Sequence, residues 1–320
     1  MGLLTQYGLL AGLVPVTTGR VFWVSPSASY TVAGETYSAS DYNDGLTPFS
    51  AFRTVDYAIG KTTANVGDVV VLLPGAHSVS ATVTLDIVGV TVTGIPATQG
   101  VGGSARASRG PSKNKTSITT TETAGMIFTV TATDVEIAWL HFIPITAGAG
   151  VSVSSAAHRF FSHDNTFALG STAQTATFGI TFPVGVTAPN LNSVIRNCYF
   201  LADGAVGPAI RAAQSVHGLK IESSTFELTG IAAWAKAIQT TLANVGVHIR
   251  DCDFVQPTLT TTVITAAIDV TGMTADSSCQ VYRCYFPEGC DGIVSTATGD
   301  VALAESYTAN STGGTLKTSA

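Results

Sequence analysis

The sequence predicts an all-β protein built as a parallel β-helix, a solenoid in which each short coil pairs with its neighbours. Charged residues make up only 11% of the 320-residue chain and hydrophobic residues 45%, and the many small and β-branched side chains suit pleated strands. The 32 glycines and 12 prolines imply frequent turns. The most specific observation is a motif that recurs at a nearly regular spacing, which is typical of a solenoid.

The recurring motif ends in phenylalanine and is clearest in IRNCYF, residues 195–200, and IRDCDF, residues 249–254. Its six copies lie 25 to 33 residues apart and end at Phe142, Phe167, Phe200, Phe226, Phe254 and Phe286. A Gly-Ile or Ala-Ile pair precedes most of the copies, for example at 209–210 and 237–238. We therefore expect each unit to hold a first strand at this pair, a variable turn, a second strand, a tight bend and a third strand that reaches the Phe.

Alternation within a unit predicts which side chains face the core. Val247 and Ile249 share one face of the second strand, and Cys252 and Phe254 share one face of the third. The phase slips by one residue between the two strands, so the residue three before the Phe is expected to turn the corner. Asn and Asp adopt the left-handed backbone conformation more readily than other non-glycine residues. The corner residues predicted in this way are Asp164, Asn197, Ser223 and Asp251.

The five cysteines all lie in the second half of the chain, without a CxxC pair or the dense framework of a secreted disulfide protein. Cys198, Cys252 and Cys284 fall in the inward register beside a Phe, where a thiol fills core volume. We therefore expect buried free thiols, no metal site and no cofactor. Replacing Cys252 by serine is expected to reduce stability, because the new buried hydroxyl would be poorly satisfied.

Three segments near the start of the chain resemble a known family. RVFWVSPSAS (20–29), YNDGLTPFSAFRTVDYAI (42–59) and GDVVVLLPGAHSVSATVTL (67–85) resemble the beginning of right-handed parallel β-helix proteins of the pectate-lyase-like superfamily. The resemblance implies a right-handed helix that is entered through a strand, a loop and a short capping helix. Such beginnings are common in bacteriophage tailspike-like and other virion proteins, and in bacterial surface proteins. The resemblance implies a fold and leaves the activity open.

The chain is expected to form one domain with four parts. Residues 1–25 are expected to form a short helix or an apolar arm, since they lack the basic n-region of a signal peptide and the run of ~18 apolar residues that spans a membrane. We expect this segment to pack on the chain itself or on a partner, and a capsid is the favoured partner. Residues 26–66 are expected to form the leading segment and cap, 67–310 the coils, and 311–320 a polar tail. The pattern is interrupted at 96–116, which indicates a loop that leaves the solenoid.

Charge limits the classes of partner. A net charge of −6 argues against a nucleic-acid-binding protein, which would need a basic stripe. The 96–116 loop nevertheless carries four basic residues and no acid, so it is either a solvated loop or a contact for an acidic partner surface or a phosphate-bearing glycan. These candidate binding residues are Arg106, Arg109, Lys113 and Lys115.

Acidic side chains on the outer faces were considered as catalytic groups. Asp253 with Glu222 or Asp251 is the best pair for glycan cleavage, but Asp251 is also a predicted corner residue. The outward position four before the Phe alternates in charge, which predicts a salt-bridge ladder instead. That position holds His163, Arg196, Glu222, Arg250 and Tyr282. Pectate lyases use clustered acids for calcium and a catalytic Arg, and the sequence contains no such acidic cluster, so no catalytic residue is assigned.

These observations predict a non-enzymatic structural protein of a tailed bacteriophage. We expect it to be made in the bacterial cytoplasm and displayed on the virion surface as a homotrimeric capsid decoration or cement protein. Its expected partners are the major capsid protein or neighbouring decoration proteins, with no nucleic acid and no membrane. The alternative is a tailspike-like glycosidase or lyase, or a glycan-binding adhesin, that acts on host surface polysaccharide. Tyr199, Tyr282 and Tyr285 would then line the sugar-binding surface.

Overall fold

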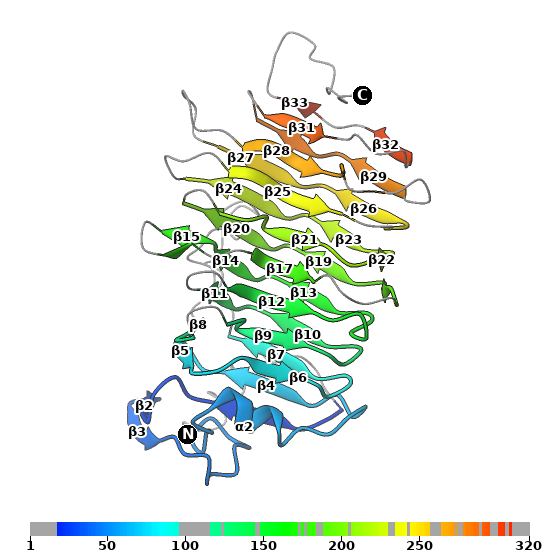
Figure 1. Ribbon diagram of the computed structural model, residues 1–320. Coiled ribbons are helices and arrows are strands. Elements are labelled where there is room, and N and C mark those ends of the chain that lie inside the picture. Colours follow the sequence, from blue (N-terminus) through cyan, green and yellow to red (C-terminus); the bar gives the residue numbers. More distant parts are fainter. Residues whose placement is uncertain are drawn as a thin grey trace.

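The computed structural model describes residues 18–95, 116–122, 125–144, 148–171, 174–175, 178–183, 188–203, 206–229, 234–241, 244–256, 264–271, 273, 278–287, 290–294, 300–304 and 307–308. The described strands stack into a rod whose coils run from the N-terminal cap to the C-terminal end (Figure 1). Three parallel sheets form the sides of the rod, and each coil between the two ends contributes one strand to each sheet. The predicted parallel β-helix is confirmed.

The three sheets are named here in the order in which the chain visits them. Sheet A contains β1 (Val21–Val24), β4 (Val69–Leu72), β7 (Thr91–Gly94), β10 (Glu136–Ala138), β13 (Phe161–His163), β19 (Val194–Arg196), β23 (Lys220–Glu222), β26 (Val247–Arg250), β29 (Ser278–Tyr282) and β32 (Asp300–Ala304). Sheet B contains β5 (Gly75–Val79), β8 (Thr116–Thr120), β11 (His141–Ile143), β14 (Thr166–Ala168), β20 (Tyr199–Ala202), β24 (Thr225–Leu228), β27 (Asp253–Val255), β30 (Tyr285–Phe286) and β33 (Tyr307–Thr308). Sheet C contains β6 (Val83–Leu85), β9 (Phe128–Val130), β12 (Ala149–Val153), β17 (Phe178–Phe182), β21 (Ile210–Ala212), β25 (Trp234–Thr240), β28 (Ile264–Asp269) and β31 (Asp291–Val294).

A tight bend joins sheet A to sheet B in each coil, and its corner residue has a left-handed backbone. All four predicted corner residues have a positive φ, which confirms the corner assignment. The full column has φ between 49° and 58° and consists of Trp139, Asp164, Asn197, Ser223, Asp251 and Arg283. Trp and Arg strain more than Asn in this conformation, so the bend is imposed by the stacked coils and not by the corner residue alone.

A second left-handed column lies where the chain returns to sheet A, and the sequence patterns did not predict it. Its residues have φ between 54° and 75° and are Gly67, Gly89, Asp134, Arg159, Asn192, Gly218 and Gly246. Arg159 is the exception to the Gly, Asn and Asp composition. Its guanidinium donates to Asp134 of the preceding coil through Nε at 2.6 Å and Nη2 at 2.5 Å. This bidentate contact ties two adjacent turns together.

A stack of phenylalanine rings fills the core behind sheet B. Phe200 and Phe226 lie 5.0 Å apart between ring centroids with 4° between their planes, and Phe226 and Phe254 lie 4.9 Å apart. All six rings predicted by the repeat are fully buried. Offset parallel stacking at this distance adds to the hydrophobic gain of burial. The repeated Phe of the sequence motif therefore forms a continuous aromatic column along the axis of the rod.

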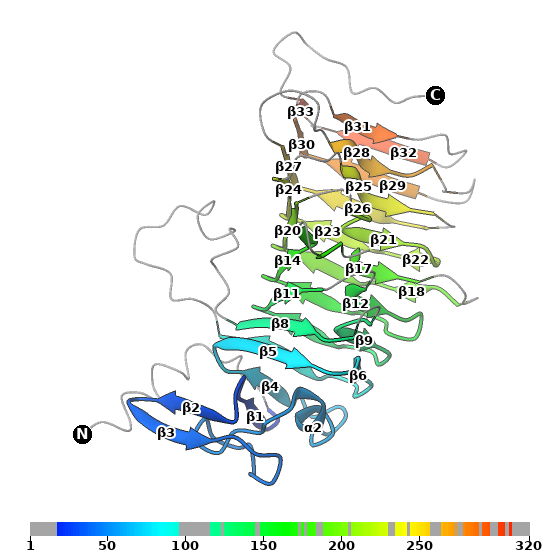
Figure 2. The ribbon, with the colours of Figure 1, turned by 60° about the vertical axis from the view of Figure 1, so that its left-hand side comes forward.

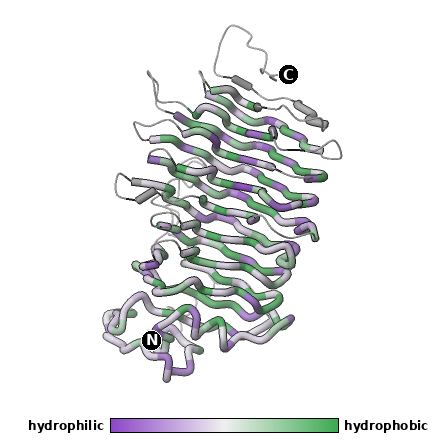
Figure 3. Tube along the Cα trace, viewed as in Figure 1, coloured by the Kyte–Doolittle hydropathy of each residue, from purple (hydrophilic) through white to green (hydrophobic). Residues whose placement is uncertain are grey.

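The Gly-Ile or Ala-Ile pair lies on the strands of sheet C. Its first position accepts only a small residue, and its second position holds a large isoleucine. The isoleucines stack in register, as in the pairing of Ile210 with Ile238. Gly179 precedes Ile180, the first isoleucine of this stack. A Cβ on Gly179 would lie 3.0 Å from ring carbons of Phe200 and 2.7 Å from the Ala209 carbonyl oxygen. A small residue is therefore needed beside the aromatic column. Figure 3 shows the resulting mixture of hydrophobic and hydrophilic positions along each coil.

The position two before each Phe is buried and holds polar as well as apolar side chains. Asn165 there accepts a hydrogen bond from the Leu140 amide at 2.9 Å and donates to the Ile137 carbonyl at 2.8 Å. Cys198, Cys252 and Cys284 occupy the same column as buried free thiols, as predicted. Burial raises the pKa of the Cys252 thiol, which keeps it protonated at neutral pH.

A strand and a short helix cover part of the N-terminal end of the rod. Strand β1 pairs with β4 and adds one strand to sheet A, and helix α2 (Val55–Ile59) contacts β1, β4 and β6. Thr54 caps α2 by accepting from the Tyr57 amide. The hairpin of β2 (Ser29–Val32) and β3 (Glu35–Ser38) extends beside this cap (Figure 2). Among the described residues, no helix is long and apolar enough to cross a membrane.

Shorter elements decorate the loops between the sheets. They are the hairpin of β15 (Gly170–Ser171) with β16 (Gln174–Thr175), and the parallel pair of β18 (Asn190–Leu191) with β22 (Val216–His217). Residues 1–17, 96–115 and 309–320 lie outside the described residues. They include most of the predicted arm, nearly all of the 96–116 loop and the polar tail.

Candidate functional site

Glu222 lies at the centre of an ion-pair ladder on the outer face of sheet A. Its Oε2 lies 2.8 Å from Nη2 of Arg196, and its Oε1 lies 2.8 Å from Nη2 of Arg250. The ladder pairing places these three side chains in adjacent coils. Only 5% of the Glu222 side chain is exposed, whereas each arginine is about half exposed. The predicted salt-bridge ladder is confirmed, and this carboxylate is fully engaged in it.

A second charged group lies on the same face, in the coil next to that of Arg196 on the side of the N-terminal cap. His163 lies between two carboxylates, with Nε2 at 2.7 Å from Glu136 and Nδ1 at 2.9 Å from Asp164. Burial by itself would lower the pKa of His163, but these two hydrogen bonds outweigh burial and raise the pKa to about 9. The imidazole is therefore a cation at neutral pH that joins two acids, which is the arrangement of a structural ion triad.

The other two acids of the candidate catalytic set lie apart from the Glu222 ladder. Asp251 is a corner residue, and its carboxylate accepts from Nε and Nη2 of Arg283, the next corner, at 2.7 and 2.9 Å. Asp253 lies beyond the bend on sheet B, in register with Thr225 and Tyr285. The structure therefore distributes Glu222, Asp251 and Asp253 over sheet A, the corner and sheet B.

The three tyrosines proposed as a sugar-binding surface do not form a common exposed face. Tyr199 is only 8% exposed, so it cannot offer its ring to a saccharide. Tyr282 lies under the Arg283 guanidinium, which is 4.5 Å from its ring centroid. Tyr285 is 41% exposed on sheet B. The expectation that Tyr199 lines a glycan groove is wrong, because its side chain is buried.

The basic residues predicted to contact a partner are not part of the described structure. Arg106, Arg109, Lys113 and Lys115 all lie in the 96–115 segment, outside the described residues. Their proposed role remains a prediction.

The outer face of sheet C carries a polar cluster that the sequence patterns did not identify. Arg211, Gln239 and Asp269 follow one another in register on β21, β25 and β28. Asp269 forms an ion pair with Lys236, and the Thr271 amide donates to its Oδ1 at 3.0 Å. Burial alone would raise the pKa of Asp269, but these contacts hold it below its usual value. The sheet C cluster therefore contains one engaged carboxylate.

Arg211 is the unusual member of the sheet C cluster. Its guanidinium lies 5.0 Å from the ring centroid of Phe178 in the neighbouring coil. Its Nε is buried and has no hydrogen-bond partner. A buried donor without a partner is costly, and it marks a position where an acceptor from outside the chain could bind. The residue after each Gly-Ile or Ala-Ile pair forms this column, so that position was the available sequence signal.

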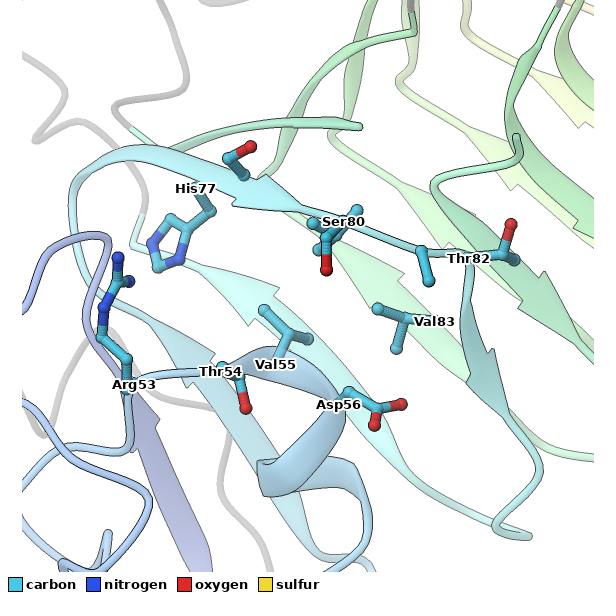
Figure 4. Close-up of a pocket in the computed structure, with 11 residues that line it drawn as sticks. Arg53, Thr54, Val55, Asp56, His77, Ser80, Thr82 and Val83 are labelled. Carbon is cyan, nitrogen blue, oxygen red and sulfur yellow. The ribbon is translucent and has the colours of Figure 1, made fainter. Parts of the chain in front are cut away.

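A hollow of about 310 Å³ lies at the N-terminal cap, between α2 and the chain that leaves β5 (Figure 4). Residues 53–56 line one side and residues 77–83 the other. Its apolar lining consists mainly of Val55, Val79 and Val83. His77 points toward Arg53 in this view but is structural, since its Nε2 bonds the Leu73 carbonyl at 2.8 Å. Burial lowers the pKa of His77 to about 4, so it is neutral at physiological pH.

Within the described ranges, no group of three or more His, Cys, Asp and Glu residues is placed to hold a metal ion. The clustered acids that hold calcium in pectate lyases have no counterpart in the sheet C cluster, where the acid is paired with Lys236.

Solved structures of carbohydrate-active proteins share this architecture. A pectin methylesterase from Aspergillus niger, in deglycosylated form, is similar with a TM-score of 0.58 and 9% identity over 94% of this chain and 92% of that chain. A rhamnogalacturonan lyase is similar with a TM-score of 0.56 and 14% identity over 87% and 73% of the two chains. Neither the family models nor the curated proteins compared with the chain match it.

The fold is therefore a right-handed parallel β-helix, as predicted. At identities of 9–14%, the likeness extends to the fold and leaves the chemistry of the outer faces to be argued from the residues of this chain.

Proposed function

We propose that the chain is a non-enzymatic structural protein of a tailed bacteriophage, displayed on the particle surface as a homotrimeric capsid decoration or cement protein. One observation carries the non-enzymatic part. Two acids on the outer faces are engaged in ion pairs within the chain, Glu222 with two arginines and Asp269 with Lys236. A glycosidase needs two carboxyl groups about 5–9.5 Å apart that both face the substrate.

The virion part of the proposal rests on other features of the chain. The leading segment resembles that of virion β-helix proteins, and it folds as β1, a loop and α2 at the base of the rod. Charged residues are only 11% of the chain, which is sparse for so long a surface. Burial of part of that surface against the shell and against two further copies would account for this sparseness.

The test is to purify particles of the phage that encodes the chain and to identify their proteins by mass spectrometry. We expect the protein in stoichiometric amounts on particles, and a trimer by light scattering after its release. Absence of the protein from purified particles would overturn the proposal. A released monomer would overturn the trimer alone.

A second candidate function is the binding of an acidic polysaccharide on the sheet C cluster. The unpartnered Nε of Arg211 favours it, since a uronate carboxylate could accept from this guanidinium. The similar solved structures include pectin methylesterases and a rhamnogalacturonan lyase, whose names refer to acidic plant polysaccharides. Titration with polygalacturonate would show binding that Arg211→Gln abolishes and that the exposed-site change Asp203→Asn leaves intact. Absence of binding by the wild-type protein would dismiss this candidate.

A further inference from the structure

The first strand of sheet B has an unpaired edge at the base of the rod. Sheet A is extended below β4 by β1, whereas sheet B ends at β5 and no described strand pairs with its other side. Helix α2 packs against β1, β4 and β6. An exposed strand edge is a template on which a further strand can add.

The hydrogen bonds of β5 identify which of its groups face this edge. The Thr121 amide donates to the Val79 carbonyl at 2.9 Å, so the backbone groups of Val79 point toward β8. Backbone direction alternates from residue to residue in a strand. The amides and carbonyls of Ala76 and Ser78 therefore point away from β8, toward the cap. Among the described strands, β8 is the one that pairs with β5, so no described strand pairs with these groups.

The hollow at the cap lies beside this edge and has the character of a side-chain pocket. It is lined by the edge residues 77–83 on one side, and its apolar lining of Val55, Val79 and Val83 can receive an aliphatic side chain. Arg53 is exposed at its rim, where Nη1 donates to the Pro26 carbonyl at 3.2 Å. No carboxylate of the described chain pairs with Arg53.

We propose that an extended segment of the capsid shell adds to sheet B along β5. The segment spans about five residues, the length of β5 from Gly75 to Val79. Its main chain bonds the amides and carbonyls of Ala76 and Ser78, an aliphatic side chain enters the hollow, and an acidic side chain pairs with Arg53. Strand addition supplies affinity through the main chain and specificity through the pocket. This rests on the proposed function, because it takes the strand from the particle.

Proline at residue 78 tests the proposal with little effect on the fold. The Ser78 amide faces the open edge and not β8, so Ser78→Pro removes only the donor that the added strand uses. We expect Ser78→Pro to keep the wild-type melting temperature and to bind protein-depleted particles about tenfold more weakly. The matched variant Ser78→Thr keeps the amide and is expected to bind like the wild type.

Hydrogen exchange gives a second readout that needs no variant. In the isolated protein the Ala76 and Ser78 amides should exchange freely, and on the particle they should be strongly protected. Protection in the isolated protein, or free exchange on the particle, would overturn the proposal. A saccharide bound in the hollow would leave these amides free to exchange, because it would not form the main-chain bonds of an added strand. If wild type and Ser78→Pro attach equally, the strand proposal alone fails. If the wild type does not attach at all, the proposed function fails as well.

Discussion

Nη2 of Arg250 lies 2.8 Å from Oε1 of Glu222, across the gap between two adjacent coils. Arg196 makes the equivalent contact from the other side, so one buried carboxylate joins three consecutive coils. Exposed ion pairs contribute little to stability, but a carboxylate that is only 5% exposed depends on its partners to offset its desolvation. The pair therefore acts in the fold, and this has measurable consequences.

Replacing Glu222 by alanine should lower the stability of the rod. The change leaves Arg196 and Arg250 facing one another without a counter-charge, and we expect a loss of about 1–3 kcal/mol. Urea unfolding followed by circular dichroism measures this loss. The matched change Asp203→Ala, at an exposed acid outside the ladder, should alter the midpoint little. Equal midpoints for the two variants would contradict the structural role of Glu222.

Truncating one ring of the aromatic column should be more costly. Phe226 is fully buried between Phe200 and Phe254, and Phe226→Ala would open a cavity in the middle of the stack. We expect a loss of about 3–5 kcal/mol. Phe161, which is half-buried on the outer face of sheet A, provides the control, and Phe161→Ala should cost clearly less. A reversed order of the two melting temperatures would refute the core assignment.

The His163 triad should make stability depend on pH in the alkaline range. The folded pKa of about 9 lies above the ordinary value of 6.5, so the protonated imidazole is favoured in the native state. The stabilisation is complete below the unfolded pKa, falls as pH rises from about 6.5 to 9, and is absent above that range. Unfolding at about pH 6 and about pH 9.5 should therefore differ by roughly 1–3 kcal/mol.

The variant His163→Gln serves as the control for this pH dependence. Glutamine keeps a hydrogen-bonding side chain but does not titrate, so the difference between the two pH values should shrink. An equally large difference in wild type and variant would assign the pH dependence to other groups.

The structure revises the expected effect of Cys252→Ser. Cys252 Sγ lies 3.3 Å from the Arg250 carbonyl oxygen, and Oγ of Ser224, in the same column, donates to the Glu222 carbonyl at 3.0 Å. A serine at 252 therefore has an acceptor two residues back, and the loss should stay below about 1 kcal/mol. Cys252→Ala removes both volume and donor and should cost more. A larger loss for serine than for alanine in thermal unfolding would restore the original expectation.

The periodicity of the sequence was sufficient to predict most of the fold, because stacking of the coils places equivalent residues in register. The corner at Asn197 and Asp251, the inward Cys252 and the Phe column all followed from spacing and alternation. Trp139 and Arg283 also turn the same corner, which no propensity would predict, since neighbouring coils impose that backbone conformation. The returning column at Asp134 and Arg159 was missed, because the variable turns before it hide the repeat.

The surface was harder to predict because partners there come from other coils. Alternating charge was sufficient to predict that Glu222 lies between two arginines. The sheet C cluster was missed, although Arg211 follows Ala209-Ile210 as Gln239 follows Ala237-Ile238. The cap hollow unites residues 53–56 with residues 77–83, and no local pattern links these two segments.

Reconstruction of the whole phage particle by electron cryomicroscopy tests the proposed role most directly. We expect a density of parallel coils on the outer surface of the shell, in groups of three, with the α2 end toward the capsid and an added strand below β5. Particles that lack this density, although the protein is made during infection, would contradict a structural role on the virion.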